Sequence, residues 1–175
     1  MLFRGKPSPT GFWQRFRSAA DGFSFHQEGD YYAAHVVANA ERVVDLFVVL
    51  LEEMPPAVDV ALSDQRSGHR WEAPALPLPD VRDALAPIKG ALAAFGGVEV
   101  TVFTSEDQLT LNGVVELFIY ARTDRWRYIL QGKGLEEHRL MRTRSWKLHR
   151  PSPPPAPELT RAIERLAADL RLSRA

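Results

Sequence analysis

Basic and aromatic side chains gather between residues 122 and 150 of this sequence. The six basic residues that we select as candidate binding residues are Arg122, Arg125, Arg127, Arg142, Arg144 and Lys147. Such a cluster is typical of surfaces that meet phosphates or carboxylates. We expect a strand over residues 125–130, which places Trp126 and Tyr128 on one face and the arginines on the other. Nucleic-acid binding by stacking needs rings on the basic face, so an acidic protein is the favoured partner and nucleic acid the alternative.

The charges are distributed unevenly along a chain whose formal net charge is zero. Residues 1–20 have a net charge of +4, and residues 21–120 carry 5 basic and 16 acidic residues. Residues 121–150 return to a net charge of +6. An acidic body with basic segments predicts either contact with an acidic partner, including self-association, or neutralisation within the chain itself.

Carboxylates and histidines that could do acid–base or metal chemistry are scattered. Asp64, Glu106 and Asp107 fall in expected turns, where carboxylates usually bond to nearby backbone N–H groups. His69 and Glu72 fall on opposite faces of an expected strand. The five histidines are His26, His35, His69, His138 and His149. None has the spacing of a metal motif, so we expect neither a metal site nor a cofactor.

Specific catalytic motifs do not occur in the sequence. It contains no phosphate-binding glycine loop, no G-x-S-x-G elbow and no cysteine, which excludes thiolate zinc sites and cysteine nucleophiles. No apolar run suits a signal peptide or a membrane span. These features predict a cytoplasmic chain without stable membrane association and leave open whether it is an enzyme.

The segment around which the other elements must pack is residues 39–54, NAERVVDLFVVLLEEM. Ten of its residues are apolar, so we expect a helix buried on several sides. Asn39 is a suitable N-cap, and Pro55 with Pro56 ends the helix. Before it, runs at 23–27 and 31–37 flank a Gly-Asp turn and predict a hairpin. The second run could instead begin the helix, and we predict a strand.

Further elements follow from periodicity. Alternation predicts strands at 57–63, 69–73 and 98–104. Apolar spacing predicts a helix over 80–95, kinked near Asp83–Pro87. We expect residues 98–131 to form a four-strand meander with a tight Asn112-Gly113 hairpin.

The terminal segments are expected to pack against this body. Residues 8–20 predict a short aromatic helix that docks on the core. Residues 145–149 predict an edge strand. Residues 151–157 form a proline-rich spacer, and a final amphipathic helix over 158–172 docks on the body.

Together these elements predict an α+β fold. Residues 31–104 have the ferredoxin-like order βαββαβ, extended by the meander and by terminal helices. We expect residues 1–150 to form one domain, followed by the spacer and a C-terminal segment at 158–175. The leading hypothesis for function is a non-enzymatic protein-interaction or regulatory module. The alternatives are a nucleic-acid-binding protein that uses 122–150 and a small hydrolase or transferase with a site near 64–72.

Overall fold

The computed structural model describes residues 21–141, 153 and 155–175. The helix expected at 8–20 and the edge strand expected at 145–149 lie outside these residues, as do three of the candidate binding residues, Arg142, Arg144 and Lys147.

The described part of the chain is an α+β fold built on one eight-stranded sheet in which every strand pairing is antiparallel. The strands are β1 (Gly22–Glu28), β2 (Tyr31–Val37), β3 (Ala57–Asp64), β4 (His69–Pro77), β5 (Val98–Phe103), β6 (Asp107–Leu111), β7 (Leu117–Ala121) and β8 (Ser173–Arg174). Their order across the sheet is β1-β2-β7-β6-β5-β3-β4-β8.

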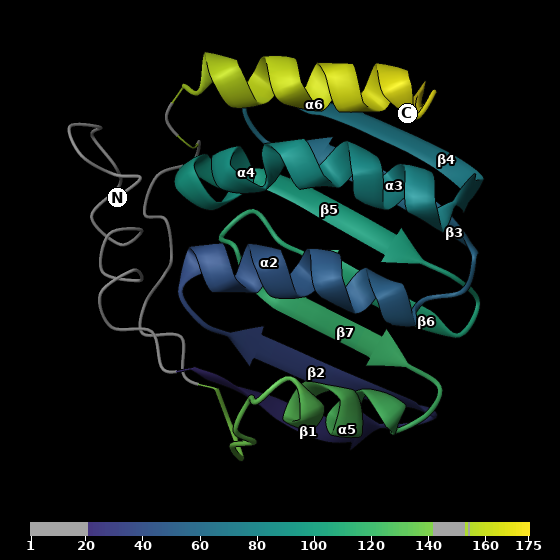
Figure 1. The fold of residues 1–175 in the computed structure, drawn as a ribbon, viewed down its shortest axis with the longest axis vertical. Coiled ribbons are helices and arrows are strands. Elements are labelled where there is room, and N and C mark those ends of the chain that lie inside the picture. The colour runs from purple at the N-terminus through teal and green to yellow at the C-terminus, as the bar shows by residue number, and fades with distance from the viewer. Residues whose placement is uncertain (1–20, 142–152, 154) are drawn as a thin grey trace.

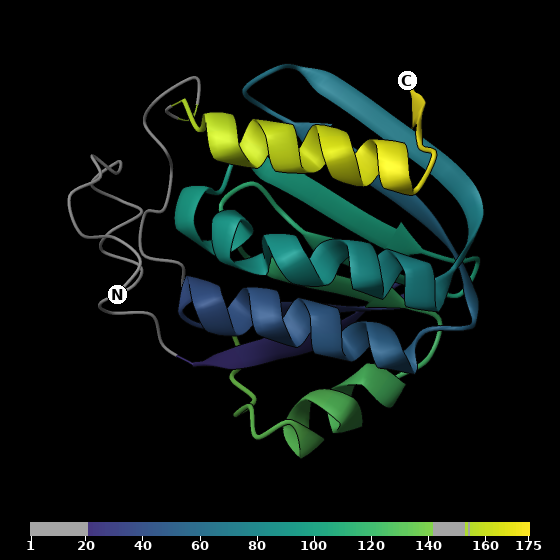
Figure 2. The ribbon, with the colours of Figure 1, turned by 45° about the horizontal axis from the view of Figure 1, so that its top comes forward.

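All the described helices lie on the same face of this sheet (Figures 1 and 2). They are α2 (Ala40–Leu50), α3 (Leu78–Leu85), α4 (Lys89–Phe95), α5 (Arg125–Gly132) and α6 (Pro157–Asp169). Three of these segments, α2, the continuous pair α3–α4, and α6, run side by side across the sheet, while α5 packs near β1 and β2 (Figure 1). No described helix is long and apolar enough to cross a bilayer.

The expected central helix is confirmed. Asn39 caps it, because its side-chain oxygen accepts a hydrogen bond from the backbone N–H of Arg42 at 3.0 Å. A 3₁₀ turn at Leu51–Glu53 follows and ends before the two prolines. Seven of the eleven residues of α2 are buried, so the helix is enclosed on several sides as its composition predicts.

The core lies between the sheet and the helices. Alternate residues of each strand face the helices, and cross-strand pairing aligns them in rows such as Val36, Leu117, Leu111, Val100 and Leu62. Each of these five side chains is at most 2% exposed. Burial of such rows supplies most of the stabilisation of a sheet with one covered face.

The helix expected over 80–95 is present and interrupted where proline requires it. α3 ends at Leu85, a 3₁₀ turn occupies Ala86–Ile88, and α4 starts at Lys89. Pro87 cannot donate a backbone hydrogen bond, which accounts for the interruption. The stripe of the last helix is also docked as expected, since Leu159, Ile163 and Leu166 are at most 2% exposed.

Two expectations about local structure need correction. The expected strand over 125–130 is the helix α5, so the meander has three strands. The Asn112-Gly113 pair does not form a two-residue hairpin. Residues 112–116 make a longer loop in which Val115 has a φ of 59°. The two-residue strand β8 has no counterpart in the sequence prediction.

The ferredoxin-like order is not confirmed. That order would place β2 beside β4 and β5, whereas β7 and β6 separate β2 from β5. β3 instead pairs with both β4 and β5.

Short segments limit the access of other strands to both edges of the sheet. At one edge, the carbonyl of Glu136 accepts from the N–H of Phe23, and the N–H of His138 donates to the carbonyl of Phe23. At the other edge, β8 pairs with Trp71 and Glu72 of β4.

Candidate functional site

No described helix covers the face of the sheet opposite the helix layer (Figures 1 and 2). We call it the open face. Pairing aligns its side chains in two rows, Ser24–His35–Phe118–Thr110–Thr101–Ala61 and His26–Ala33–Tyr120–Gln108–Phe103–Asp59. Most of these side chains are part-exposed, which distinguishes them from the fully buried rows on the helix face.

Aromatic rings cluster on the open face where β2 pairs with β7. The rings of His35 and Phe118 stack with centroids 4.4 Å apart and planes 3° from parallel. Tyr31 and Tyr120 lie 6.0 Å apart in an edge-to-face arrangement. Both geometries are favoured for aromatic pairs.

A hollow of about 240 Å³ lies where β2 begins, β7 ends and the β5–β6 turn returns. Its walls include Tyr31, Tyr120, Gln108, Glu106 and Asp30. We call it the tyrosine hollow. The adjoining turn is ordered by one side chain, because the Oγ1 atom of Thr104 accepts from the backbone N–H groups of Glu106 at 3.2 Å and Asp107 at 3.1 Å.

Glu28 fixes the position of Tyr31 at the rim of this hollow. The hydroxyl of Tyr31 donates to Oε2 of Glu28 at 2.6 Å, and Oε1 of Glu28 lies 2.6 Å from Nε2 of His26. The hydrogen bond from Tyr31 lowers the pKa of the Glu28 carboxyl, and His26 adds to this effect. The same bond raises the pKa of the Tyr31 hydroxyl, since it stabilises the protonated phenol.

Further along β2 on the open face, His35 lies near a largely buried carboxylate. Its Nε2 atom is 3.8 Å from Oε2 of Glu116, and the two side chains are 18% and 9% exposed. Asn112 orients this carboxylate by donating to the same oxygen at 3.1 Å. The distance of 3.8 Å is too long for a hydrogen bond.

The structure places the three described candidate arginines in separate contacts with the chain's own carboxylates. Arg122 pairs with Asp30 at 2.5 Å, Arg125 with Asp107 at 2.7 Å, and Arg127 with Glu137 at 2.7 Å. A ligand at any of these three arginines would compete with an existing ion pair.

Asp107 is the acceptor that joins α5 to the sheet. Its Oδ1 atom accepts from the indole N–H of Trp126 at 2.9 Å, and Oδ2 accepts from Arg125. Arg125 also donates to the carbonyl of Glu53 at 3.0 Å. Trp126 is fully buried and Asp107 is 7% exposed. These contacts give the carboxylate a structural role and show why Trp126 faces inward.

The region proposed for a hydrolase site does not bring its acidic residues together. In the β3–β4 hairpin Asp64 and His69 face the helices, whereas Glu72 faces the opposite side of the sheet. Asp64 is 1% exposed, and its Oδ1 atom accepts from the backbone N–H of Arg66 at 3.0 Å.

Arg66 joins this hairpin to the end of α4. Its guanidinium donates to the carbonyls of Phe95 at 2.8 Å and Gly96 at 2.5 Å. A cation at a helix C-terminus is favourable because the last carbonyl groups carry partial negative charge. Burial lowers the pKa of Arg66, and the negative charge of Asp64 opposes this effect.

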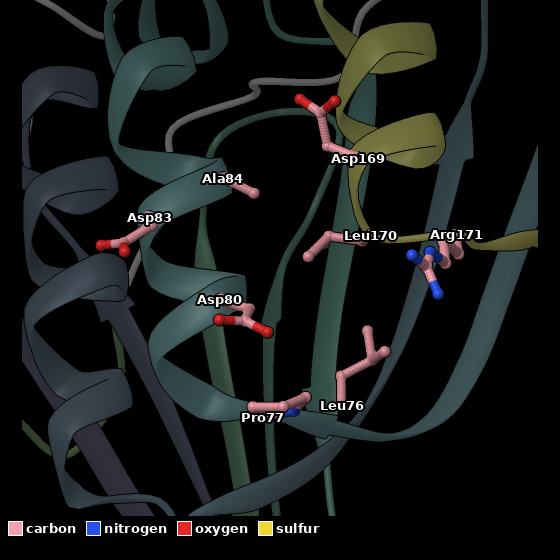
Figure 3. A pocket seen from close by; sticks show the side chains of 8 residues that line it. All are labelled: Leu76, Pro77, Asp80, Asp83, Ala84, Asp169, Leu170 and Arg171. Carbon is pink, nitrogen blue, oxygen red and sulfur yellow. The ribbon is translucent and has the colours of Figure 1, made fainter.

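A second hollow lies between α3 and the end of α6 (Figure 3). Its volume is about 670 Å³. Asp80 and Ala84 project from α3 towards Leu170 at the end of α6, while Asp83 points away (Figure 3).

The described residues contain no group of three or more histidine or carboxylate side chains placed to hold a metal ion.

Sequence patterns alone do not single out the open face as a candidate site. They predict Tyr31 as a strand residue, but its proximity to Tyr120 depends on the β2–β7 pairing between segments about ninety positions apart. The available signal is alternation in the β2 and β7 segments, which places Tyr31, His35, Phe118 and Tyr120 on one side of their strands.

Comparisons with known proteins add no assignment to this geometry. The chain matches no protein-family model, no curated protein and no solved structure.

Proposed function

We propose that this chain is a non-enzymatic protein-interaction module whose binding surface is the open face of the sheet. The observation that carries this proposal is the position of the helices, which all lie on one side of the eight strands in the described part of the chain. The opposite side presents part-exposed aromatic and polar side chains.

The composition of this surface supports a protein partner. Aromatic side chains are enriched at the centres of protein interfaces, and polar side chains surround them. Tyr31, Phe118, Tyr120 and Phe103 supply the rings. The surrounding charged groups include Glu28, which makes the rim polar.

The edges of the sheet are less favourable for a partner. Adding a strand requires a row of free N–H and C=O groups. The backbone N–H and C=O groups of Phe23 are already bonded to Glu136 and His138. On the other edge, β8 pairs with Trp71 and Glu72 of β4. A partner of the described body is therefore better accommodated on the open face than as an added strand at an edge of the sheet.

Site-specific photo-crosslinking tests the proposal. A photoreactive phenylalanine analogue is introduced at Thr101 on the open face, or at Glu164 on the exposed side of α6 as a matched control. Each chain is expressed in its native cells and irradiated, and adducts are identified by mass spectrometry. We expect a discrete protein adduct from position 101 that is absent from position 164.

The identified protein is then purified and titrated with the unmodified chain and with Phe118→Asp. Weaker binding by the variant, with an unchanged circular dichroism spectrum, supports the proposal. Adducts from position 164 alone would contradict it. Adducts dominated by RNA or DNA would instead favour the nucleic-acid alternative.

A further inference from the structure

We infer that the tyrosine hollow accepts an arginine side chain of the partner protein. The inference rests on the proposed function, because it assigns a role to one end of the open face. Four properties of the hollow carry it: its two rings, its carboxylates, an arginine already bound at its edge, and its size.

The two tyrosine rings provide surfaces for a planar cation. Tyr31 and Tyr120 are 6.0 Å apart with an interplanar angle of 63°, so their rings meet as a corner rather than as parallel plates. The hydrogen bond between Tyr31 and Glu28 holds one wall in place. Guanidinium groups stack on aromatic faces and are attracted by the negative charge above the ring.

Acidic groups at the hollow favour a cation. Asp30 and Glu106 both line it. Asp107 also lines it but is committed to Trp126 and Arg125. Asp30 and Glu106 are therefore the carboxylates that a cation in the hollow would meet.

Arg122 already makes one of the contacts that we assign to the partner, the ion pair with Asp30. Arg122 lines the hollow, and its guanidinium is 2.5 Å from Oδ2 of Asp30. The two side chains are 52% and 81% exposed, and exposed ion pairs of this kind contribute little stability. An incoming guanidinium can replace Arg122 at Asp30 while also contacting the tyrosines.

The size of the hollow favours one side chain over a free small molecule. Sites for drug-sized ligands usually enclose about 300–1,000 Å³, and this hollow has about 240 Å³. Arginine suits it better than lysine, because a guanidinium is planar and can donate two parallel hydrogen bonds to one carboxylate.

Nuclear magnetic resonance of the labelled full chain tests the inference. The probe is the capped peptide Gly-Gly-Arg-Gly-Gly, and the matched peptides contain citrulline or lysine in place of arginine. Citrulline has nearly the shape of arginine but no charge. We expect millimolar binding of the arginine peptide, with the largest shifts at Tyr31, Gln108 and Tyr120 and at least fivefold weaker binding of the other peptides.

Variants separate the hollow from general attraction to an acidic surface. Glu106→Gln and Tyr120→Leu are each expected to weaken binding of the arginine peptide at least threefold. Asp80→Asn removes one negative charge at the hollow of Figure 3. It is expected to leave the affinity for the arginine peptide unchanged. Correct folding of each variant is checked by the dispersion of its amide spectrum.

Several outcomes would overturn the inference. They are equal binding of the citrulline or lysine peptide, shifts centred on α3 and α6, equal effects of Asp80→Asn and Glu106→Gln, or no shift at all. The proposed function is judged separately by crosslinking at Thr101. An open-face adduct together with a failed peptide titration would reject the arginine site alone.

Discussion

The indole N–H of Trp126 donates to Oδ1 of Asp107 at 2.9 Å, so one carboxylate at the start of β6 holds α5 against the sheet. Asp107→Ala leaves the buried indole without an acceptor and removes the carboxylate partner of Arg125, which keeps its hydrogen bond to the carbonyl of Glu53. We expect a loss of about 2–3 kcal/mol in the free energy of unfolding, measured by chemical denaturation. Glu106→Ala, at the exposed neighbouring residue, should change it by less than about 0.5 kcal/mol.

A double-mutant cycle tests whether the contact itself accounts for this loss. Trp126→Phe removes the donor and keeps most of the ring volume. If the hydrogen bond matters, the combined variant will lose less stability than the sum of the two single variants. Strict additivity would contradict the assigned role of Asp107.

Arg66 is expected to stabilise the end of α4 through its two hydrogen bonds to the carbonyls of Phe95 and Gly96. Arg66→Met keeps the aliphatic stem but leaves both carbonyls without this donor. The expected loss is roughly 1–3 kcal/mol by thermal or urea unfolding. Arg70→Met, an exposed arginine of the same hairpin, provides the control, and an equal effect of the two substitutions would exclude a specific contact.

Two glycines of the α4 region should respond in opposite directions to alanine. Gly90 lies in a helix with open space where the Cβ atom of an alanine would lie, so Gly90→Ala should stabilise the protein by about 0.5–1 kcal/mol. Gly97 has a φ of 75°, and a Cβ there would lie 2.6 Å from Nη1 of Arg66 and 2.7 Å from Cγ of Pro153.

Gly97→Ala should therefore destabilise the protein by more than the roughly 1–2 kcal/mol that left-handed backbone alone costs an alanine. Gly29→Ala isolates that backbone cost, because Gly29 has a φ of 64° and no atom within 4 Å of the added carbon. The unfolding midpoints of the three variants should fall in the order Gly90→Ala, Gly29→Ala, Gly97→Ala, from the most to the least stable. A Gly97→Ala variant as stable as the Gly29→Ala variant would refute this order.

The hydrogen bond between Tyr31 and Glu28 predicts a pH dependence. The folded-state pKa of Glu28 is lowered from its ordinary value of 4.5. The ionised Glu28 carboxylate therefore contributes fully to stability above its ordinary pKa. This contribution is lost as the pH falls through the lowered folded-state pKa. In a carbon-13 titration of Glu28, Tyr31→Phe should move the midpoint upwards towards the ordinary value. An unchanged midpoint would show that Tyr31 is not the main cause.

Local patterns in the sequence identify the elements that depend on neighbouring residues. Asn39 caps the central helix and Pro87 interrupts the second one because both effects act within one or two turns. The error at α5 has a local cause as well. Trp126 and Leu130 fit both a strand that alternates and a helix in which residues four positions apart share a face.

The sheet order could not be read in the same way. Alternation indicates that β3 and β5 are strands but does not indicate that they are neighbours, because that pairing joins segments separated by the α3–α4 region. The open face follows from this order, and so does the tyrosine hollow, since Tyr31 and Tyr120 meet only when β2 pairs with β7. Charge alone indicated an acidic body and basic segments but could not show that Arg122, Arg125 and Arg127 each have a carboxylate partner.

The position of β8 on β4 has a consequence for the behaviour of concentrated solutions. Beyond the two paired residues, β4 continues through Pro74 and Pro77, which lack the amide hydrogen that an added chain would need. Molecules therefore cannot readily extend one another's sheets at this margin, and fibril growth from the native state is hindered there.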